Sequence, residues 1–180
     1  MRWMACLLSV LMLTGCSAAS AEPDELKLVS VLGVDGVRET VLTAVSEGAD
    51  NATCRGDDFE QARDEIRWSG QGAELSLTGV RYIVVGAQAD LESVLAAAAE
   101  DAELGVSAYV WVAEGRAADV LNGCEDPSSD LRLLILKGSS APTVAQALAS
   151  VVTDGAVRLP CLGEVNGRVM ERGEVVWRRK

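Results

Sequence analysis

The residues of this chain that could do chemistry are carboxylates, thiols and hydroxyls, because its 180 residues include no histidine. A chain without an imidazole has no Ser-His-Asp triad, no Cys-His pair and no histidine-ligated zinc. Carboxylates can still transfer protons or bind cations, so each acidic cluster needs its own interpretation. Asp57-Asp58 is typical of a helix N-cap. Glu125 and Asp126 with Asp130 match no calcium-loop spacing and are typical of a solvated turn.

Hydroxyl and phosphate-binding motifs are equally weak. Ser139-Ser140 has no base nearby, which favours a helix cap over a nucleophile. The GVDGV segment around Asp35 lacks the order of a phosphate-binding loop and its following lysine, and Asp35 is predicted to form a turn instead. The sequence therefore predicts a non-enzymatic protein with no catalytic residue, no metal ligand and no cofactor.

The amino terminus carries the most specific motif. A single positive charge, Arg2, precedes a nearly uniform apolar run over residues 3–13. That run is too short for a membrane span, which needs about 20 residues, and it is typical of a secretory signal. It ends in Leu13-Thr14-Gly15-Cys16, an order that resembles a bacterial lipobox, in which a diglyceride alkylates the cysteine thiol. We expect residues 1–15 to be a lipoprotein signal peptide and Cys16 to be the lipid attachment site; the alternative is a plain signal peptide with a chance cysteine.

The predicted mature chain is acidic and of single-domain size. Removal of 15 of the 180 residues leaves 165 and, because Arg2 is lost, takes the net charge from −11 to −12. Nucleic acid is therefore an unfavourable partner, and membrane attachment is expected through the lipid and its acyl chains, such as palmitate. Residues 16–25 are predicted to be a flexible tether, since SAASAEPD at 17–24 reaches at most about 28 Å. Residues 26–180 are predicted to form one globular domain.

Three cysteines remain once Cys6 is removed with the signal peptide and Cys16 is lipidated. Cys54, Cys124 and Cys161 are odd in number and none lies in a CxxC pair. One disulfide among them and three small buried thiols both stay open as interpretations.

Strand and helix signals alternate along the predicted domain. Asp35-Gly36 and Asn166-Gly167 each predict a two-residue β-hairpin loop, the first between strands at 26–34 and 37–45. Residues 47–55 are predicted to be a loop. Between the hairpins, periodicity and caps predict strands at 75–77, 80–86, 106–115 and 131–136 and helices at 57–68, 90–105, 117–123 and 142–155. The predicted fold class is α/β (α+β mixed): a single domain with a mixed β-sheet and packed helices, opening and closing with β-hairpins.

The ordered set of segments resembles the N-terminal domain of the Ger-type spore germinant receptor C-subunit lipoproteins of endospore-forming bacteria. After the lipobox, DELKLVSVLGVDG is similar to the family's first strand and Gly-x-Asp turn. ELSLTGVRYIVVGAQA, VSAYVWVAEGRAADVLNG and RLPCLGEV with GEVVW are similar to its later strands and short helix, in the family's order. Three features depart from the family: no Trp-Asp follows the lipid cysteine, the family's central histidine is absent, and this sequence lacks the further C-terminal region.

The resemblance implies a lipid-anchored, non-enzymatic subunit or accessory of a nutrient germinant receptor. Its partners would be membrane-embedded receptor subunits, and it would lie at the outer face of the bacterial cell membrane, which in spores is the inner spore membrane. A solute-binding lipoprotein of a membrane transporter is the alternative from a different class, although about 165 residues are few for two lobes and a cleft. A cell-envelope hydrolase using carboxylates would need a paired acidic site that the sequence does not display.

Overall fold

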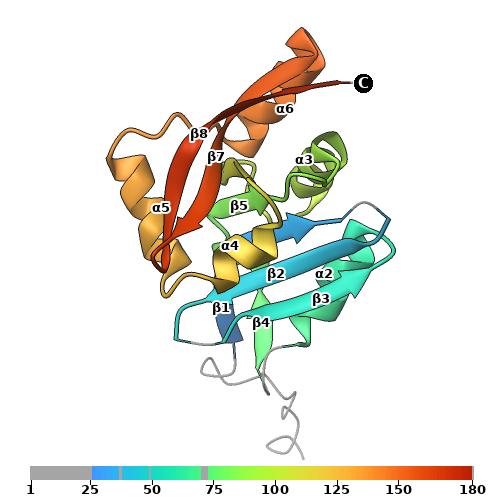
Figure 1. The fold of residues 1–180 in the computed structure, drawn as a ribbon. Coiled ribbons are helices and arrows are strands. Elements are labelled where there is room, and N and C mark those ends of the chain that lie inside the picture. Colours follow the sequence, from blue (N-terminus) through green and yellow to red (C-terminus); the bar gives the residue numbers. More distant parts are fainter. Residues whose placement is uncertain (1–25, 37, 49, 70–72, 180) are drawn as a thin grey trace, which may run out of the picture.

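The computed structural model describes residues 26–36, 38–48, 50–69 and 73–179. The predicted signal peptide, the predicted lipid site Cys16 and the predicted tether lie outside the described residues. The described residues form a mixed α/β fold around one eight-stranded sheet, which confirms the predicted fold class (Figure 1).

The strand order in the sheet is β3-β2-β1-β5-β6-β7-β8, with β4 paired to the start of β1. Four central strands are parallel, and antiparallel strands flank them on both sides. The strands are β1 (Leu26–Asp35), β2 (Thr40–Ser46), β3 (Ala52–Gly56), β4 (Glu74–Ser76), β5 (Tyr82–Val85), β6 (Tyr109–Ala113), β7 (Ala156–Val165) and β8 (Arg168–Arg178). The helices are α2 (Phe59–Arg67), the 3₁₀-helix η2 (Leu77–Gly79), α3 (Leu91–Glu100), α4 (Ala117–Asn122), α5 (Pro127–Leu136) and α6 (Val144–Asp154).

Helices cover both faces of the sheet and divide the core in two. One apolar cluster joins the sheet to α2, α3 and α6, and the other joins it to α4 and α5 (Figure 1). Neighbouring residues of one strand supply opposite clusters: Ile83 packs in the first and Val84 in the second. This is why the central strands are apolar at nearly every position, as expected for strands buried on both faces.

Most predicted helix ends are confirmed. The side chain of Asp58 accepts a hydrogen bond from the Gln61 N–H at 2.8 Å, and this cap starts α2. Gly155 closes α6 with φ 64°, a left-handed conformation that glycine adopts without a Cβ clash. Asp90 starts α3, but that helix ends at Glu100 rather than at the predicted residue 105. Gly123 closes α4 as predicted.

Two predicted elements are wrong. Residues 131–136 form the second half of helix α5, because Asp126 caps that helix and Pro127 stands in its first turn. Residues 52–55 of the predicted loop, together with Gly56, form the edge strand β3, which pairs with β2 from Thr40↔Gly56 to Ala44↔Ala52. The missed strand is short and polar, so it carries little periodicity.

Both predicted hairpins exist, but only one has the predicted loop. Val165 pairs with Arg168 across a two-residue Asn166-Gly167 turn. Asp35 instead stays in β1, where it pairs with Val41, so the loop between β1 and β2 is longer than two residues.

Candidate functional site

Large apolar side chains are exposed where β1 begins. Leu26 and Leu28 are 44% and 56% exposed, although both lie in a paired strand. Trp68, directly after α2, is 72% exposed. Trp68 precedes β4, whose first residue Glu74 pairs in parallel with Leu26, and α2 packs against β4. We use the name β1-start surface for these three exposed residues, Leu26, Leu28 and Trp68, which lie on or directly after elements that adjoin β4.

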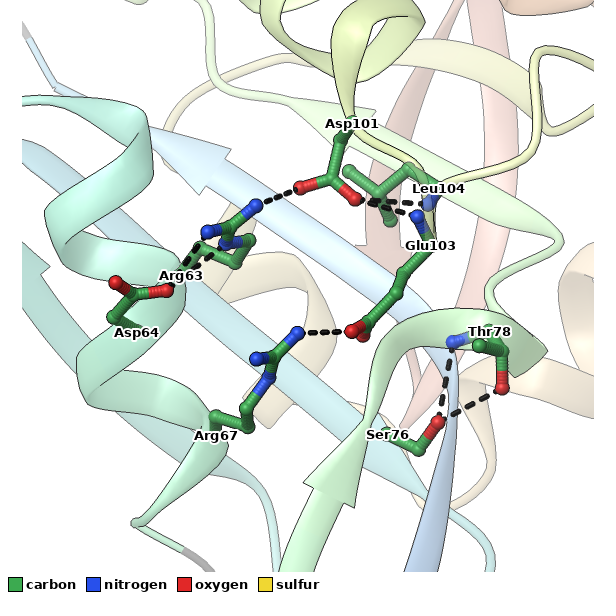
Figure 2. A network of polar contacts seen from close by, with 8 residues as sticks. All are labelled: Arg63, Asp64, Arg67, Ser76, Thr78, Asp101, Glu103 and Leu104. Atoms are coloured by element: carbon green, nitrogen blue, oxygen red, sulfur yellow. Dashed lines mark hydrogen bonds and ion pairs between the residues drawn. The ribbon is translucent and has the colours of Figure 1, made fainter.

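A network of ion pairs fixes α2 and thereby positions Trp68. Arg63 Nη1 donates to Asp101 Oδ2 at 2.7 Å. Arg67 pairs with Glu103 one helical turn further on, and Figure 2 shows both pairs. Asp101 is nearly buried and also accepts the backbone N–H groups of Glu103 at 2.8 Å and Leu104 at 3.2 Å. The last turn of α2 is therefore tied to the segment after α3.

The ionised forms of Asp101 and Arg63 are both stabilised in this network. Burial alone would raise the pKa of Asp101, but the hydrogen bond from Arg63 and the two backbone donors outweigh it and lower that pKa below its ordinary value. The hydrogen bonds to Asp101 and Asp64 raise the pKa of Arg63. Both partners therefore remain ionised at neutral pH, and the ion pair links α2 to the segment after α3 across this range.

Trp68 shares a shallow hollow on the outside of α2 with several carboxylates. The shallow hollow beside its ring is lined by Asp58, Glu60, Asp64 and Glu65. An anionic membrane surface would be repelled from such a rim, whereas a protein surface with basic residues would complement it. The aromatic ring can supply apolar contact area, and the carboxylates beside it can orient a bound partner.

A polar cleft opens near the same end of the sheet. It has a volume of about 890 Å³ and lies between the start of β1, the loop from β2 to β3 and the loop from α4 to α5. Lys27 lines it together with Glu47, Asp50, Glu125 and Asp126, so its wall is acidic overall. Its volume suits a small polar molecule.

The cleft also contains a cysteine thiol of low reactivity. Burial, reinforced by the nearby carboxylates of Asp130 and Glu164, raises the pKa of Cys124 to about 11. A thiol with that pKa is protonated at neutral pH and is a poor nucleophile. Cys124, Cys54 and Cys161 are all free thiols, and only Cys161 is fully buried.

The acidic cluster predicted to be a solvated turn is divided between structural roles. Asp126 caps α5 by accepting the Ser129 N–H at 2.9 Å, which lowers its pKa. Asp130 is buried and accepts the Val169 N–H at 2.8 Å and the Arg168 Nε–H at 2.9 Å. The solvated-turn prediction is therefore wrong for Asp130, which joins α5 to β8.

The serine pair is likewise structural, but it is not a helix cap. Thr143 caps α6 with a full capping box. Ser139 donates to the carboxylate of Glu171, which also accepts the Trp111 indole N–H at 3.2 Å, and Ser140 donates to Glu174 at 3.1 Å. These contacts hold the segment before α6 against β8.

Within the described ranges, no group of three or more His, Cys, Asp or Glu side chains is arranged to hold a metal ion. No described helix has the length and apolar character needed to cross a membrane. The comparisons with protein families, curated proteins and solved structures returned no match to this chain. A functional assignment therefore rests on the sequence motifs and on the surfaces described above.

Sequence reasoning missed Trp68, although a signal for it exists. The buried stripe of α2 follows Phe59, Ala62 and Ile66, and Trp68 lies two residues beyond that stripe. Two residues turn a helix by about 200°, so a large aromatic side chain there faces away from the core.

Proposed function

We propose that this protein is a lipid-anchored, non-enzymatic subunit or accessory of a nutrient germinant receptor, which acts in spore germination by contact with membrane-embedded partners. The observation that carries the proposal is the β1-start surface. Leu26 begins the domain only ten residues after Cys16, the predicted lipid site, so an exposed apolar side chain lies where the predicted tether joins the domain.

The tether and the surface support each other physically. Ten residues span at most about 36 Å, so a lipid on Cys16 keeps the domain close to the outer face of the cell membrane or, in a spore, of the inner spore membrane. Confinement of two partners to one surface raises their effective concentration toward the mM range, so a weak contact is sufficient. Trp is among the residues enriched at positions that dominate interface energies, and here it follows a helix that the Arg63–Asp101 and Arg67–Glu103 pairs tie to the segment after α3.

The charge around Trp68 favours a protein over bare lipid. The acidic rim opposes an anionic bilayer, and the resemblance to the C-subunit family supplies the class of partner, a multi-spanning receptor subunit. Basic residues on the outer loops of such a subunit would complement the rim.

The polar cleft supports a second candidate, a solute-binding lipoprotein of a transporter. Its volume of about 890 Å³ and its mixture of Lys27 with acidic side chains suit a small zwitterionic or cationic solute. This candidate predicts that small solutes raise the melting temperature of the protein in the absence of any partner.

The test compares the unmodified full chain with its Trp68→Ala variant. Each is purified from membranes of sporulating cells, and the partners that co-purify are measured. We expect the recovery of multi-spanning partners to fall about thirtyfold, because removal of a central aromatic anchor costs roughly 2 kcal/mol. Leu136→Ala is the matched control, since Leu136 is 74% exposed on α5, which covers the other face of the sheet. Cys16→Ala should abolish fatty-acid labelling and reduce the same recovery.

Nutrient-triggered germination should fall in parallel, while nutrient-independent germination stays unchanged. Equal recovery of partners with Trp68→Ala and the unmodified chain would remove the β1-start surface from the proposal. Recovery of the protein alone after gentle crosslinking, together with a solute-induced thermal shift, would favour the transporter candidate.

A further inference from the structure

The strand β8 forms an open edge of the sheet. No described strand pairs with its outer side, and Val175 and Val176 are 40% and 45% exposed. A register shift opposite Cys161 and Leu162 interrupts the middle of β8, but pairing with β7 is regular from Glu174 to Arg178. An open, regular and partly apolar edge is a template for pairing with another strand.

The sequence of this segment is self-complementary when reversed. Glu174-Val175-Val176-Trp177-Arg178 has an acid at one end, a base at the other and apolar residues between. We propose that β8 pairs antiparallel with β8 of a second copy of this chain, about a two-fold axis through Val176. In that register Glu174 of each copy lies opposite Arg178 of the other, Val175 lies opposite Trp177, and the two Val176 residues face each other.

The backbone is oriented for this pairing. The Arg179 N–H donates to the Gly155 carbonyl at 2.8 Å, and the register continues through Trp177↔Val157 and Val175↔Leu159. Because hydrogen-bonding direction alternates along an antiparallel strand, the N–H and C=O groups of Glu174, Val176 and Arg178 point to the open side. These three residues are the ones that the proposed register sets in hydrogen-bonded pairs, so each copy satisfies the exposed groups of the other.

Charge distinguishes a second copy from other occupants. A strand of one charge sign would satisfy either Glu174 or Arg178 and would repel the other. The reversed copy pairs both, and opposite charges set directly across antiparallel strands are favourable. Within one copy, the contacts of Glu174 are exposed: its carboxylate lies 4.0 Å from Arg158 Nη1 and accepts the Ser140 hydroxyl at 3.1 Å.

The dimer is independent of the proposed function. The β1-start surface lies on elements beside β4, and β8 is the fourth strand from β1 in the sheet, so both surfaces can be occupied together. A closed two-fold interface also covers residues 174–178 of this edge, so that further strands cannot add to that segment.

The test is the oligomeric state of the full chain, purified in detergent and followed by analytical ultracentrifugation. The unmodified chain should sediment as a concentration-dependent dimer. Glu174→Arg alone and Arg178→Glu alone each place like charges opposite twice per dimer, so each should weaken dimerisation about tenfold. The double variant E174R/R178E should restore dimerisation. In the double variant, as in Glu174→Arg, the guanidinium at position 174 lies near Arg158 of the same copy. Because this intramolecular contact is the same in both variants, recovery of dimerisation reports the pairing between copies.

Crosslinking supplies a second readout that does not depend on charge. Val176→Cys should give a disulfide-linked dimer on mild oxidation, since paired Cα atoms about 5.5 Å apart fit a disulfide. Val152→Cys on α6, with Val152 66% exposed, is the matched control and should give far less. A monomer at all concentrations, a double variant as weak as the single variants, or equal crosslinking at positions 152 and 176 would each overturn the proposal.

Discussion

The hairpins β1–β2 and β7–β8 both contain an Asp-Gly or Asn-Gly dipeptide, but their backbones follow different paths there. Between β7 and β8, Asn166 and Gly167 have φ values of 53° and 75°, and the chain reverses in these two residues. Between β1 and β2, Asp35 is the last residue of the first strand, Gly36 has φ 136°, and β2 begins only at Thr40.

The difference arises from the use of the Asp35 carboxylate elsewhere in the fold. Its two oxygens accept the backbone N–H groups of Ala117 at 2.7 Å and Ala118 at 2.9 Å, which are the first residues of α4. Gly86 makes this approach possible, because a Cβ atom there would lie 1.9 Å from Asp35 Oδ1. Asn166 is exposed, so its side chain caps no buried element. A dipeptide therefore sets the turn only where no distant element needs its side chain.

Asp35→Ala should cause the largest loss of stability, because it removes the contact that distinguishes the β1–β2 hairpin from the β7–β8 hairpin. The two α4 donors lose their acceptor in a buried site and the helix loses its N-terminal anion, which we expect to cost about 2 to 4 kcal/mol of unfolding free energy. Denaturant midpoints of a 22–180 fragment measure it. Asp57→Ala is the control, since Asp57 is exposed beside the same end of the sheet, and it should change stability by less than about 0.5 kcal/mol. Equal effects of the two substitutions would mean that the α4 cap contributes nothing.

The elements that the sequence predicts correctly carry local signals. Caps at Asp58 and Asp90, stops at Gly123 and Gly155, and the runs around β5 and β6 each lie within a few residues of the structure they specify. Helix α5 shows where such signals conflict. Its LRLLIL run fits either a strand or a helix, and the decision comes from Asp126 and Pro127 upstream.

Cys16, Asp35 and Trp68 also differ in how far the sequence predicts their roles, because local signals are visible in a sequence and tertiary contacts are not. Cys16 follows from a contiguous motif that needs no tertiary structure, and it lies outside the described residues. The role of Asp35 depends on the packing of α4 across β1, which no local pattern contains. The grouping of Trp68 with Leu26 depends on the parallel pairing of β4 with β1, so composition and periodicity could not reveal it.

Gly36→Val tests whether the longer loop between β1 and β2 requires a glycine. A Cβ atom at Gly36 would lie 1.8 Å from the Glu39 carbonyl oxygen, and a β-branched residue disfavours φ 136°. We expect a loss of about 2 to 3 kcal/mol by denaturant unfolding of the same fragment. An unchanged midpoint would show that the loop between β1 and β2 can rearrange freely and that only the Asp35 cap fixes this end of the hairpin.

Gly167→Ala should have the smallest effect of the three, although it also alters a hairpin glycine of positive φ. No atom lies within 4 Å of a Cβ built at Gly167, so the substitution adds no clash and costs only the strain of φ 75° for a residue with a Cβ. That strain is about 1 kcal/mol. Asn166→Gly is the control, because glycine accepts φ 53° and should leave the unfolding free energy within about 0.5 kcal/mol of its original value. If Gly167→Ala cost as much as Gly36→Val, backbone conformation alone would explain both hairpins, and the close contact with Glu39 would not distinguish them.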